Sequence, residues 1–347
     1  MTSVLKLMRS GAIAIALAGL LGSSAMAADT LHIYNWTGYI SQAMLDKFTK
    51  DTGIAVSLDT FDNNETLLAK LRGGSSGYDI TVASTDFVPL MIAEKLIQPV
   101  NISELPNYDH LDAQWKKSSW DPGNVYSIPY FWGVTSYAVD TDLYKGPTDS
   151  LSLLFNPPAE LQGKVGMFSA PTEVIALAMR YLDIEPCTTD PEKLKKVDAL
   201  LQAQRPFVKI YDSAGIMGRL VSGETAISQV ANGEGLQARM QKPSLKFVFA
   251  KEGGVAWIDN LVVPTSAARP DLAKKFISFL MDPANAALQQ KDVGYPTGVV
   301  GTEPMLPKEI ATAPEAQVPA DYKKVVSPVC SEEAAKKYDL IWTRLRQ

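Results

Sequence analysis

The sequence contains few of the residues that catalytic and metal centres use. Only two cysteines and two histidines occur among its 347 residues. His32 lies in a predicted strand and His110 in a polar loop, and neither is near a Cys or Asp pattern typical of a metal site or a catalytic triad. A P-loop and a GxGxxG motif are also missing. We therefore expect no metal, no cofactor and no catalysis.

One pentapeptide fits a hydrolase motif. Residues 73–77 read Gly-Gly-Ser-Ser-Gly, which matches GxSxG and would make Ser75 a nucleophile. In a hydrolase this motif follows a strand and opens a helix, so that the serine is held on a strained turn. Here it follows a predicted helix and precedes a predicted strand, which favours an ordinary loop. A serine hydrolase is therefore an alternative that the pattern disfavours.

The chain also lacks an excess of basic residues. It has 33 Lys and Arg against 38 Asp and Glu, which gives a formal net charge of -5. Nucleic-acid binding needs a basic face that neutralises phosphates, so we expect no nucleic-acid partner. Mild acidity favours the approach of a cationic solute, although it is also common among proteins that need it only for solubility.

Long apolar runs are missing after the first residues. Lys6 and Arg9 precede the run 11–21, and small residues ending in Ala25-Met26-Ala27 follow it. This order is typical of a secretory signal peptide, and the run is too short for the roughly 20 residues of a membrane span. We predict that residues 1–27 are removed on export to the periplasm. The 320 residues that remain out of 347 are enough for two domains.

The two cysteines, Cys187 and Cys330, lie in the second half of the chain. One pair supplies too few ligands for zinc, and an oxidising compartment favours a disulfide. We favour a bridge between them over two free buried thiols.

Strands and helices alternate along the chain, which predicts βαβ units around mostly parallel sheets. The long β-rich runs 126–139 and 255–263 predict crossings between two lobes. We expect an α/β protein with residues 28–134 and 260–305 in the N-terminal lobe and 135–259 and 306–347 in the C-terminal lobe. Each lobe would have a central sheet flanked by helices, with the ligand in the cleft. The pattern predicts strands at 31–36, 54–58, 78–83, 164–168, 208–211, 226–230 and 246–250, and helices at 41–49, 64–71, 173–182, 191–204, 215–221 and 271–280.

Aromatic and acidic residues stand where these strands end. Trp36-Thr37-Gly38-Tyr39 follows the first strand, and Ser84-Thr85-Asp86-Phe87 follows the third. Trp257 and Asp259 share one face of a strand by alternation, and Tyr295 lies in a turn. Each such residue alone is more often used for packing or capping. Together, aromatic faces and carboxylates are what an alkylammonium ligand needs, since a buried cation requires a negative partner.

Five segments resemble one protein family. They are residues 35–40 (Asn-Trp-Thr-Gly-Tyr-Ile), 78–85, 128–133, 252–259 and 293–297 (Val-Gly-Tyr-Pro-Thr), and they are similar to spermidine/putrescine-binding proteins of bacterial ABC importers. The resemblance implies a two-lobe periplasmic binding protein, type II-like, that closes on its ligand. It also implies residue roles. Trp36, Tyr39 and Trp257 would be aromatic walls, Asp259 and Glu173 would hold amines, and Ser84 and Tyr295 would donate or accept hydrogen bonds.

Two positions depart from the family pattern. Ala231 stands where the family often has a tryptophan, and Glu234 nearby adds a carboxylate if it points inward. Asp86 replaces a residue that is often aromatic or small. These departures leave a diamine of another length, or a zwitterion such as γ-aminobutyrate, as alternative ligands. A zwitterion needs a positive partner, for which Arg219 and Arg239 are the nearest candidates, but helical spacing predicts that both face solvent.

The sequence thus favours a non-catalytic, monomeric binding protein that captures a polyamine and delivers it to the membrane permease of an ABC importer. A sensory binding protein with the same fold is an alternative. The predicted ligand-binding residues are Trp36, Thr37, Tyr39, Ser84, Thr85, Asp86, Glu173, Glu234, Trp257, Asp259 and Tyr295.

Overall fold

The structure is a computed structural model that describes residues 29–74, 76–319, 321–326 and 330–347. The predicted signal peptide, residues 1–27, and the serine of the GxSxG match, Ser75, lie outside the described residues. Within the part that is described, no helix is long and apolar enough to cross a membrane.

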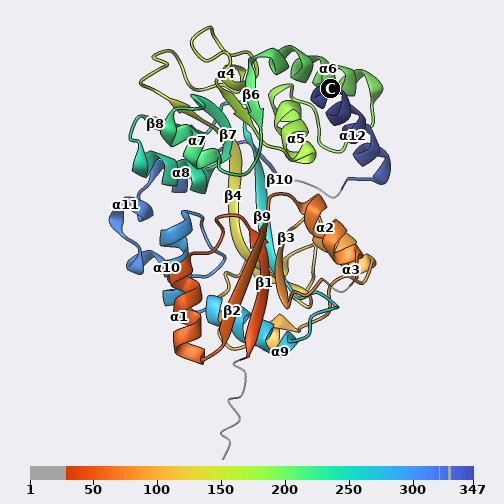
Figure 1. Cartoon of the computed structure of the whole chain (residues 1–347), viewed down its shortest axis with the longest axis vertical. Coiled ribbons are helices and arrows are strands. Elements are labelled where there is room, and N and C mark those ends of the chain that lie inside the picture. Colours follow the sequence, from red (N-terminus) through yellow and green to blue (C-terminus); the bar gives the residue numbers. More distant parts are fainter. Residues whose placement is uncertain (1–28, 75, 320, 327–329) are drawn as a thin grey trace, which may run out of the picture.

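The first lobe begins with parallel strands that alternate with helices (Figure 1). Strand β1 lies between β2 and β3 and pairs in parallel with both. Helix α1 starts where the Ser41 hydroxyl accepts the N–H of Met44, and it ends at Gly53 in the left-handed conformation. The elements are β1 (Thr30–Trp36), α1 (Gln42–Thr52), β2 (Ala55–Phe61), α2 (Asn64–Arg72), β3 (Ile80–Ser84), α3 (Val88–Ala93), α9 (Pro270–Leu280) and α10 (Pro283–Val293).

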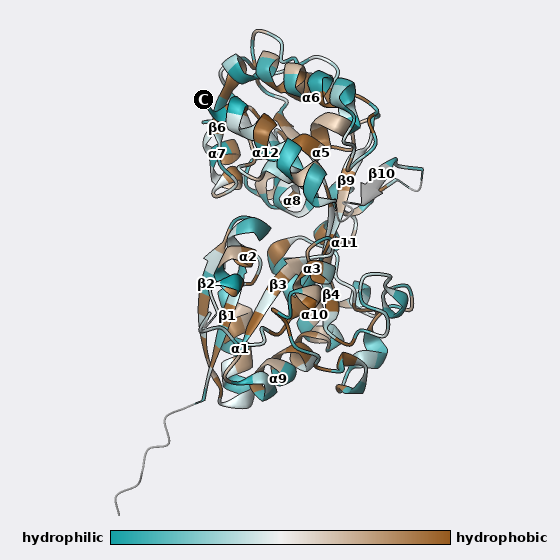
Figure 2. Ribbon diagram, turned by 90° about the vertical axis from the view of Figure 1, so that its right-hand side faces the viewer, coloured by the Kyte–Doolittle hydropathy of each residue, from teal (hydrophilic) through white to brown (hydrophobic). Residues whose placement is uncertain are grey.

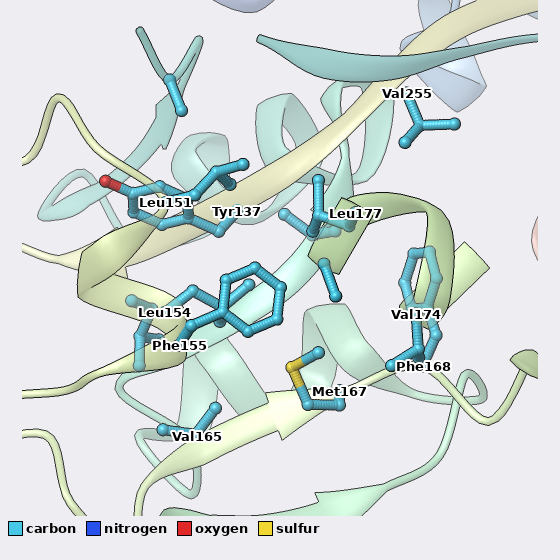
Figure 3. Close-up of a cluster of buried hydrophobic side chains, with 14 of the residues drawn as sticks. Tyr137, Leu151, Leu154, Phe155, Val165, Met167, Phe168, Val174, Leu177 and Val255 are labelled. Atoms are coloured by element: carbon cyan, nitrogen blue, oxygen red, sulfur yellow. The ribbon is translucent and has the colours of Figure 1, made fainter. Parts of the chain in front are cut away.

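The second lobe repeats the pattern around a second core. Strand β5 lies between β6 and β7 and pairs in parallel with both. Figure 3 shows Phe155, Met167 and Leu177 packed together at the centre of this core. The elements are α4 (Ser152–Phe155), β5 (Val165–Met167), α5 (Pro171–Tyr181), α6 (Pro191–Gln204), β6 (Val208–Tyr211), α7 (Ile216–Ser222), β7 (Ile227–Ala231), α8 (Asn232–Gln241), β8 (Leu245–Val248) and α12 (Glu332–Arg346).

Two long antiparallel strands, β4 (Ser127–Asp140) and β9 (Gly254–Val262), connect the lobes through a narrow waist (Figure 2). They pair from Ser127 opposite Val262 to Thr135 opposite Val255, with one bulge between Pro129 and Phe131. The described strands therefore form one ten-stranded sheet, with β10 (Lys324–Val326) added beside β9. We expected a separate sheet in each lobe. The continuous ladder arises because β4 and β9 are long enough to serve both.

Separate apolar cores identify the lobes. The core of the first lobe contains Ile128 and Leu261, and that of the second contains Tyr137 and Val255, so both crossing strands change lobe along their length. The residue at which each lobe begins stays a prediction. The remaining elements are α11 (Lys308–Ala311) and the short 3-10 turns Ile102–Glu104, Tyr108–His110, Trp115–Lys117, Arg205–Phe207, Glu303–Met305 and Pro314–Ala316.

The favoured disulfide is present: Cys187 and Cys330 are bonded, with their Cα atoms 5.0 Å apart. The bond ties the loop after α5 to the start of α12. That helix also buries Ala334, Tyr338 and Ile341 in the core of the second lobe. The disulfide therefore fixes an element that is already docked by apolar contacts.

Removal of this disulfide is expected to lower stability without dissociating α12. For the double substitution Cys187→Ser/Cys330→Ser we expect a loss of about 2–5 kcal/mol in the free energy of unfolding, because the cross-link no longer restricts the unfolded chain. Urea unfolding followed by circular dichroism measures the loss. A reducing agent should destabilise the native protein in the same way and leave the double variant unaffected. An unchanged unfolding midpoint in the variant would contradict the prediction.

Candidate functional site

A cavity of about 270 Å³ lies between the two lobes. Its walls come from the carboxyl ends of β1, β2 and β3, from β9, and from the first turns of α5 and α8. All the sequence-predicted binding residues line it except Thr85, and they are Trp36, Thr37, Tyr39, Ser84, Asp86, Glu173, Glu234, Trp257, Asp259 and Tyr295. Thr85 has a structural role instead. Its hydroxyl donates to the carbonyl of Ile258 at 2.8 Å and accepts from the Asn260 amide at 3.1 Å.

The loop after β1 brings two aromatic residues to the cavity. Gly38 has φ 76°, a conformation that side chains other than glycine rarely adopt, and the chain reverses there. The N–H of Tyr39 then donates to the carbonyl of Trp36 at 3.2 Å. Tyr39 is consequently turned inward and buried, while Trp36 packs on Phe61 with their rings 4.6 Å apart. Phe61, at the end of β2, is a cavity residue that the sequence analysis missed.

Asp259 is held at the centre of the site by two hydroxyl donors. The Tyr39 hydroxyl donates to Oδ2 at 2.7 Å and the Ser84 hydroxyl donates to Oδ1 at 2.6 Å. Asn64 fixes Ser84 in turn, because its amide donates to the Ser84 hydroxyl at 3.0 Å. Burial nevertheless raises the pKa of Asp259 to about 6, although both hydrogen bonds favour the charged form. The carboxyl is thus oriented but not neutralised.

Three more carboxyl groups face the same cavity. Burial raises the pKa of Asp86 to about 7 and that of Glu234 to about 7. Burial, with the added charge of Asp259, raises the pKa of Glu173 to about 8. Asp62 and Asp292, which the sequence analysis did not select, also line the cavity. Among the described lining residues there is no lysine or arginine, so the cavity has acidic groups and no basic side chain beside them.

The aromatic residues pack against each other at one end of the cavity. The ring of Tyr295 lies 5.2 Å from that of Tyr39 and 5.1 Å from that of Trp257. The Trp257 and Tyr295 rings meet edge to face, a favourable arrangement that fixes both. Tyr39 connects these three ring systems to Asp259, because its hydroxyl donates a hydrogen bond to the Asp259 carboxyl.

Two glycines make room for these rings. A Cβ atom on Gly233, in the first turn of α8, would lie 2.4 Å from the Tyr295 ring. A Cβ on Gly133, in β4, would lie 2.5 Å from the Trp257 ring. Contacts this short do not occur, so any side chain at either position would displace a ring. Neither glycine could be selected from the sequence, because neither carries a functional group.

The arginines considered for a zwitterion do not reach the cavity. The Arg219 guanidinium pairs with Asp212 at 3.0 Å, and that of Arg239 pairs with Glu315 at 2.6 Å. Neither residue lines the cavity. The expectation that Arg219 faces solvent is wrong, because its side chain is only 13% exposed beside Asp212. Both cations are therefore neutralised by carboxylates outside the cavity.

The chain matches a known family over most of its length. Residues 43–318 match the model of the bacterial extracellular solute-binding proteins. The chain belongs to this family. Its two-lobe periplasmic binding protein fold, expected from the sequence, is confirmed by a solved structure, the spermidine/putrescine ABC transporter substrate-binding protein PotD from Streptococcus pneumoniae. That structure is 28% identical, with a TM-score of 0.75, and the match covers 92% of this chain and 99% of the other.

Curated relatives of this solute-binding protein are named for polyamines. The spermidine/putrescine-binding periplasmic protein 1 of Haemophilus influenzae is 35% identical, over 87% of this chain and 84% of the relative. The putrescine-binding periplasmic protein SpuD of Pseudomonas aeruginosa is 34% identical, over 87% of this chain and 88% of the relative. A family of solute-binding proteins is not a family of enzymes, so this chain is not a hydrolase.

The raised pKa values predict that pH controls the empty cleft of this solute-binding protein. These carboxyls have pKa values near 6 to 8 in the lobe arrangement described, and we expect ordinary values when the lobes move apart to a more open form and water enters. The closed form therefore binds more protons, and its advantage is lost as the pH rises through this window. Without ligand, the radius of gyration from small-angle X-ray scattering should be smaller at pH 5 than at pH 8.5.

The double variant Asp86→Asn/Glu173→Gln is the matched control for this measurement. Its neutral amides remove much of the repulsion, so its scattering should change little between the two pH values. Identical scattering curves for the unsubstituted protein at pH 5 and pH 8.5 would refute the proposed pH control.

The close contact at Gly233 predicts an effect of a single methyl group. We expect Gly233→Ala to lower the free energy of unfolding by about 1–3 kcal/mol, because the methyl overpacks the site and displaces the Tyr295 ring. Thermal unfolding measures the change, and near-UV circular dichroism reports the altered ring. Gly218→Ala is the control, since a Cβ at this position on α7 meets nothing within 4 Å. Equal effects of the two substitutions would argue against the prediction.

Proposed function

We propose that this chain is a periplasmic receptor that captures a polyamine between its lobes and delivers it to the membrane permease of an ABC importer. The supporting observation is a group of four carboxyls, with Asp259 buried and the other three half-buried, beside three aromatic ring systems in a cavity without a basic residue among its described lining. An alkylammonium gains about 0.5–2 kcal/mol from an aromatic face. It also relieves the cost of burying each carboxylate alone.

The distribution of the acids favours an extended cation over a metal ion. No group of three or more His, Cys, Asp or Glu among the described residues could hold a metal. Asp86 lies in the turn after β3 and Asp259 lies on β9 opposite the end of β3, whereas Glu173 and Glu234 lie in the first turns of α5 and α8 in the second lobe. A ligand with two or more amines contacts both sets at once. Since it binds the closed form better, it shifts the protein towards closure.

We assign roles to the lining residues on this basis. Asp259, oriented by Tyr39 and Ser84, holds one ammonium, and Glu173, Glu234 and Asp86 hold the others. Trp36, Tyr39, Trp257 and Tyr295 pack on the methylene chain, and Thr37 borders the entrance. Thr85 acts indirectly, because it ties β3 to β9 next to Asp259. A zwitterion is disfavoured, because its carboxylate would find no lysine or arginine among the described residues of the cavity lining.

The cellular setting is part of the same proposal. Residues 1–27 have the pattern of a signal peptide, the curated relatives are named as periplasmic proteins, and a disulfide fits an oxidising compartment. We propose that the protein acts there as a monomer and that the permease recognises its closed form.

The ligand class is testable by thermal shift with putrescine, cadaverine, spermidine, agmatine and γ-aminobutyrate. We expect the compounds without a carboxylate to raise the unfolding temperature and γ-aminobutyrate to leave it unchanged, because binding to the folded state stabilises it. Asp259→Asn should weaken putrescine binding by at least about 100-fold in calorimetry, because a buried ammonium loses its partner.

Asp142→Asn is the control for this substitution, since Asp142 is an exposed carboxylate outside the cavity. It should bind putrescine as the unsubstituted protein does. The proposal is wrong if no amine shifts the unfolding temperature, or if Asp259→Asn keeps full affinity.

A further inference from the structure

A second cavity of about 260 Å³ adjoins the cleft on the side of α2 and α12. It shares Asp86, Thr172 and Val255 with the first cavity, so the two meet at these residues. Its volume is close to that of the first, and each lies just below the roughly 300–1,000 Å³ of typical small-molecule sites. We call it the side chamber. None of the functional assignments above uses it.

The walls of the side chamber are mainly apolar and come from both lobes. Leu68, Phe87 and Leu90 face it from the first lobe. The second lobe contributes Ala176 and Met179 from α5, Ile184 from the loop after α5, and Ala335 and Tyr338 from α12. Such a wall favours hydrocarbon, which gains about 25 cal/mol for each Å² of apolar surface removed from water.

The polar groups of the side chamber are mostly acidic. Glu65, Asp86 and Asp339 line it, and the Glu65 carboxylate accepts from the Thr172 hydroxyl at 3.4 Å across the two lobes. The only basic residue among its described lining, Arg180, is paired with Asp183 at 2.6 Å. The chamber therefore combines hydrocarbon walls with a net negative charge, which suits neither a carboxylate nor a phosphate.

Asp86 stands at the junction and lines both cavities. No side chain among the described residues donates a hydrogen bond to its carboxyl. An ammonium beside Asp86 could carry one substituent into each cavity. A primary amine would use only one of them.

We infer that the side chamber accepts a hydrocarbon group carried on one amine of the ligand, so that the protein binds N-alkyl or N-aralkyl polyamines. The inference rests on the proposed polyamine function and names a wider substrate class for the same site. The polyamine chain occupies the cleft beside Asp259. The substituted ammonium lies at Asp86, and its alkyl or aryl group packs between Leu68 and Met179.

The test compares putrescine with N-benzylputrescine by calorimetry on the mature chain. We expect the benzyl derivative to bind the unsubstituted protein at least as tightly as putrescine does. Ala335→Phe, at an exposed position on α12 that lines the chamber, should fill it. This variant is expected to weaken N-benzylputrescine binding at least about tenfold and to change putrescine binding less than about twofold. Ala176→Leu is a second filling variant with the same expected result.

Leu340→Phe is the matched control, because Leu340 is exposed on the same helix and does not line the chamber. It should change neither affinity. The inference is overturned if N-benzylputrescine binds the unsubstituted protein more than about 100-fold more weakly than putrescine does, or if the filling variants leave its affinity unchanged. If neither compound binds, the polyamine function itself fails, which is a distinguishable result.

Discussion

The cleft depends on one constraint, which is that several carboxyls are confined between the two lobes. No basic side chain in the described lining neutralises them. Two like charges 4 Å apart repel by about 4 kcal/mol in a partly buried environment. Burial raises the pKa values of Asp86, Glu173, Glu234 and Asp259 to between about 6 and about 8, and repulsion from neighbouring carboxylates adds to this for Asp86 and Glu173. Protons, separation of the lobes or a bound cation can each relieve this repulsion, and only the last is selective for a ligand.

The scaffold holds this arrangement with ordinary packing. Asp259 lies on β9, which is hydrogen-bonded to β3 on one side and β4 on the other, so its backbone cannot shift alone. Tyr39 links the Asp259 carboxyl to the aromatic residues. Glycine has no side chain, so Gly133 leaves space for the Trp257 ring and Gly233 leaves space for the Tyr295 ring. Polar orientation and aromatic packing therefore reinforce each other, and a change in either is transmitted to the acid.

Much of the fold and of the cavity lining could be predicted from the sequence, because parallel strands bring their carboxyl ends to one edge of a sheet. Trp36, Ser84 and Asp86 were found in this way, and Phe61 was missed because β2 extends three residues beyond the predicted 54–58. Helix α8 was missed since Asn232-Gly233-Glu234-Gly235 has a low helix propensity. Its glycines are instead required by contacts with Tyr295 and Phe247. The side chamber needs two lobes brought together, which local patterns do not encode.

The pairing of β4 with β9 through the waist, interrupted only by the bulge between Pro129 and Phe131, has a mechanical consequence. Opening the protein must bend a hydrogen-bonded ribbon, since no flexible loop separates the lobes along these two strands. A ribbon of paired strands bends readily out of its own plane. It resists shear within that plane, because sliding one strand past the other breaks the hydrogen bonds between them. Bending of the ribbon is therefore the easiest relative motion of the two lobes. Because this motion keeps the strands in register, it returns the opposing walls of the cleft to the same alignment.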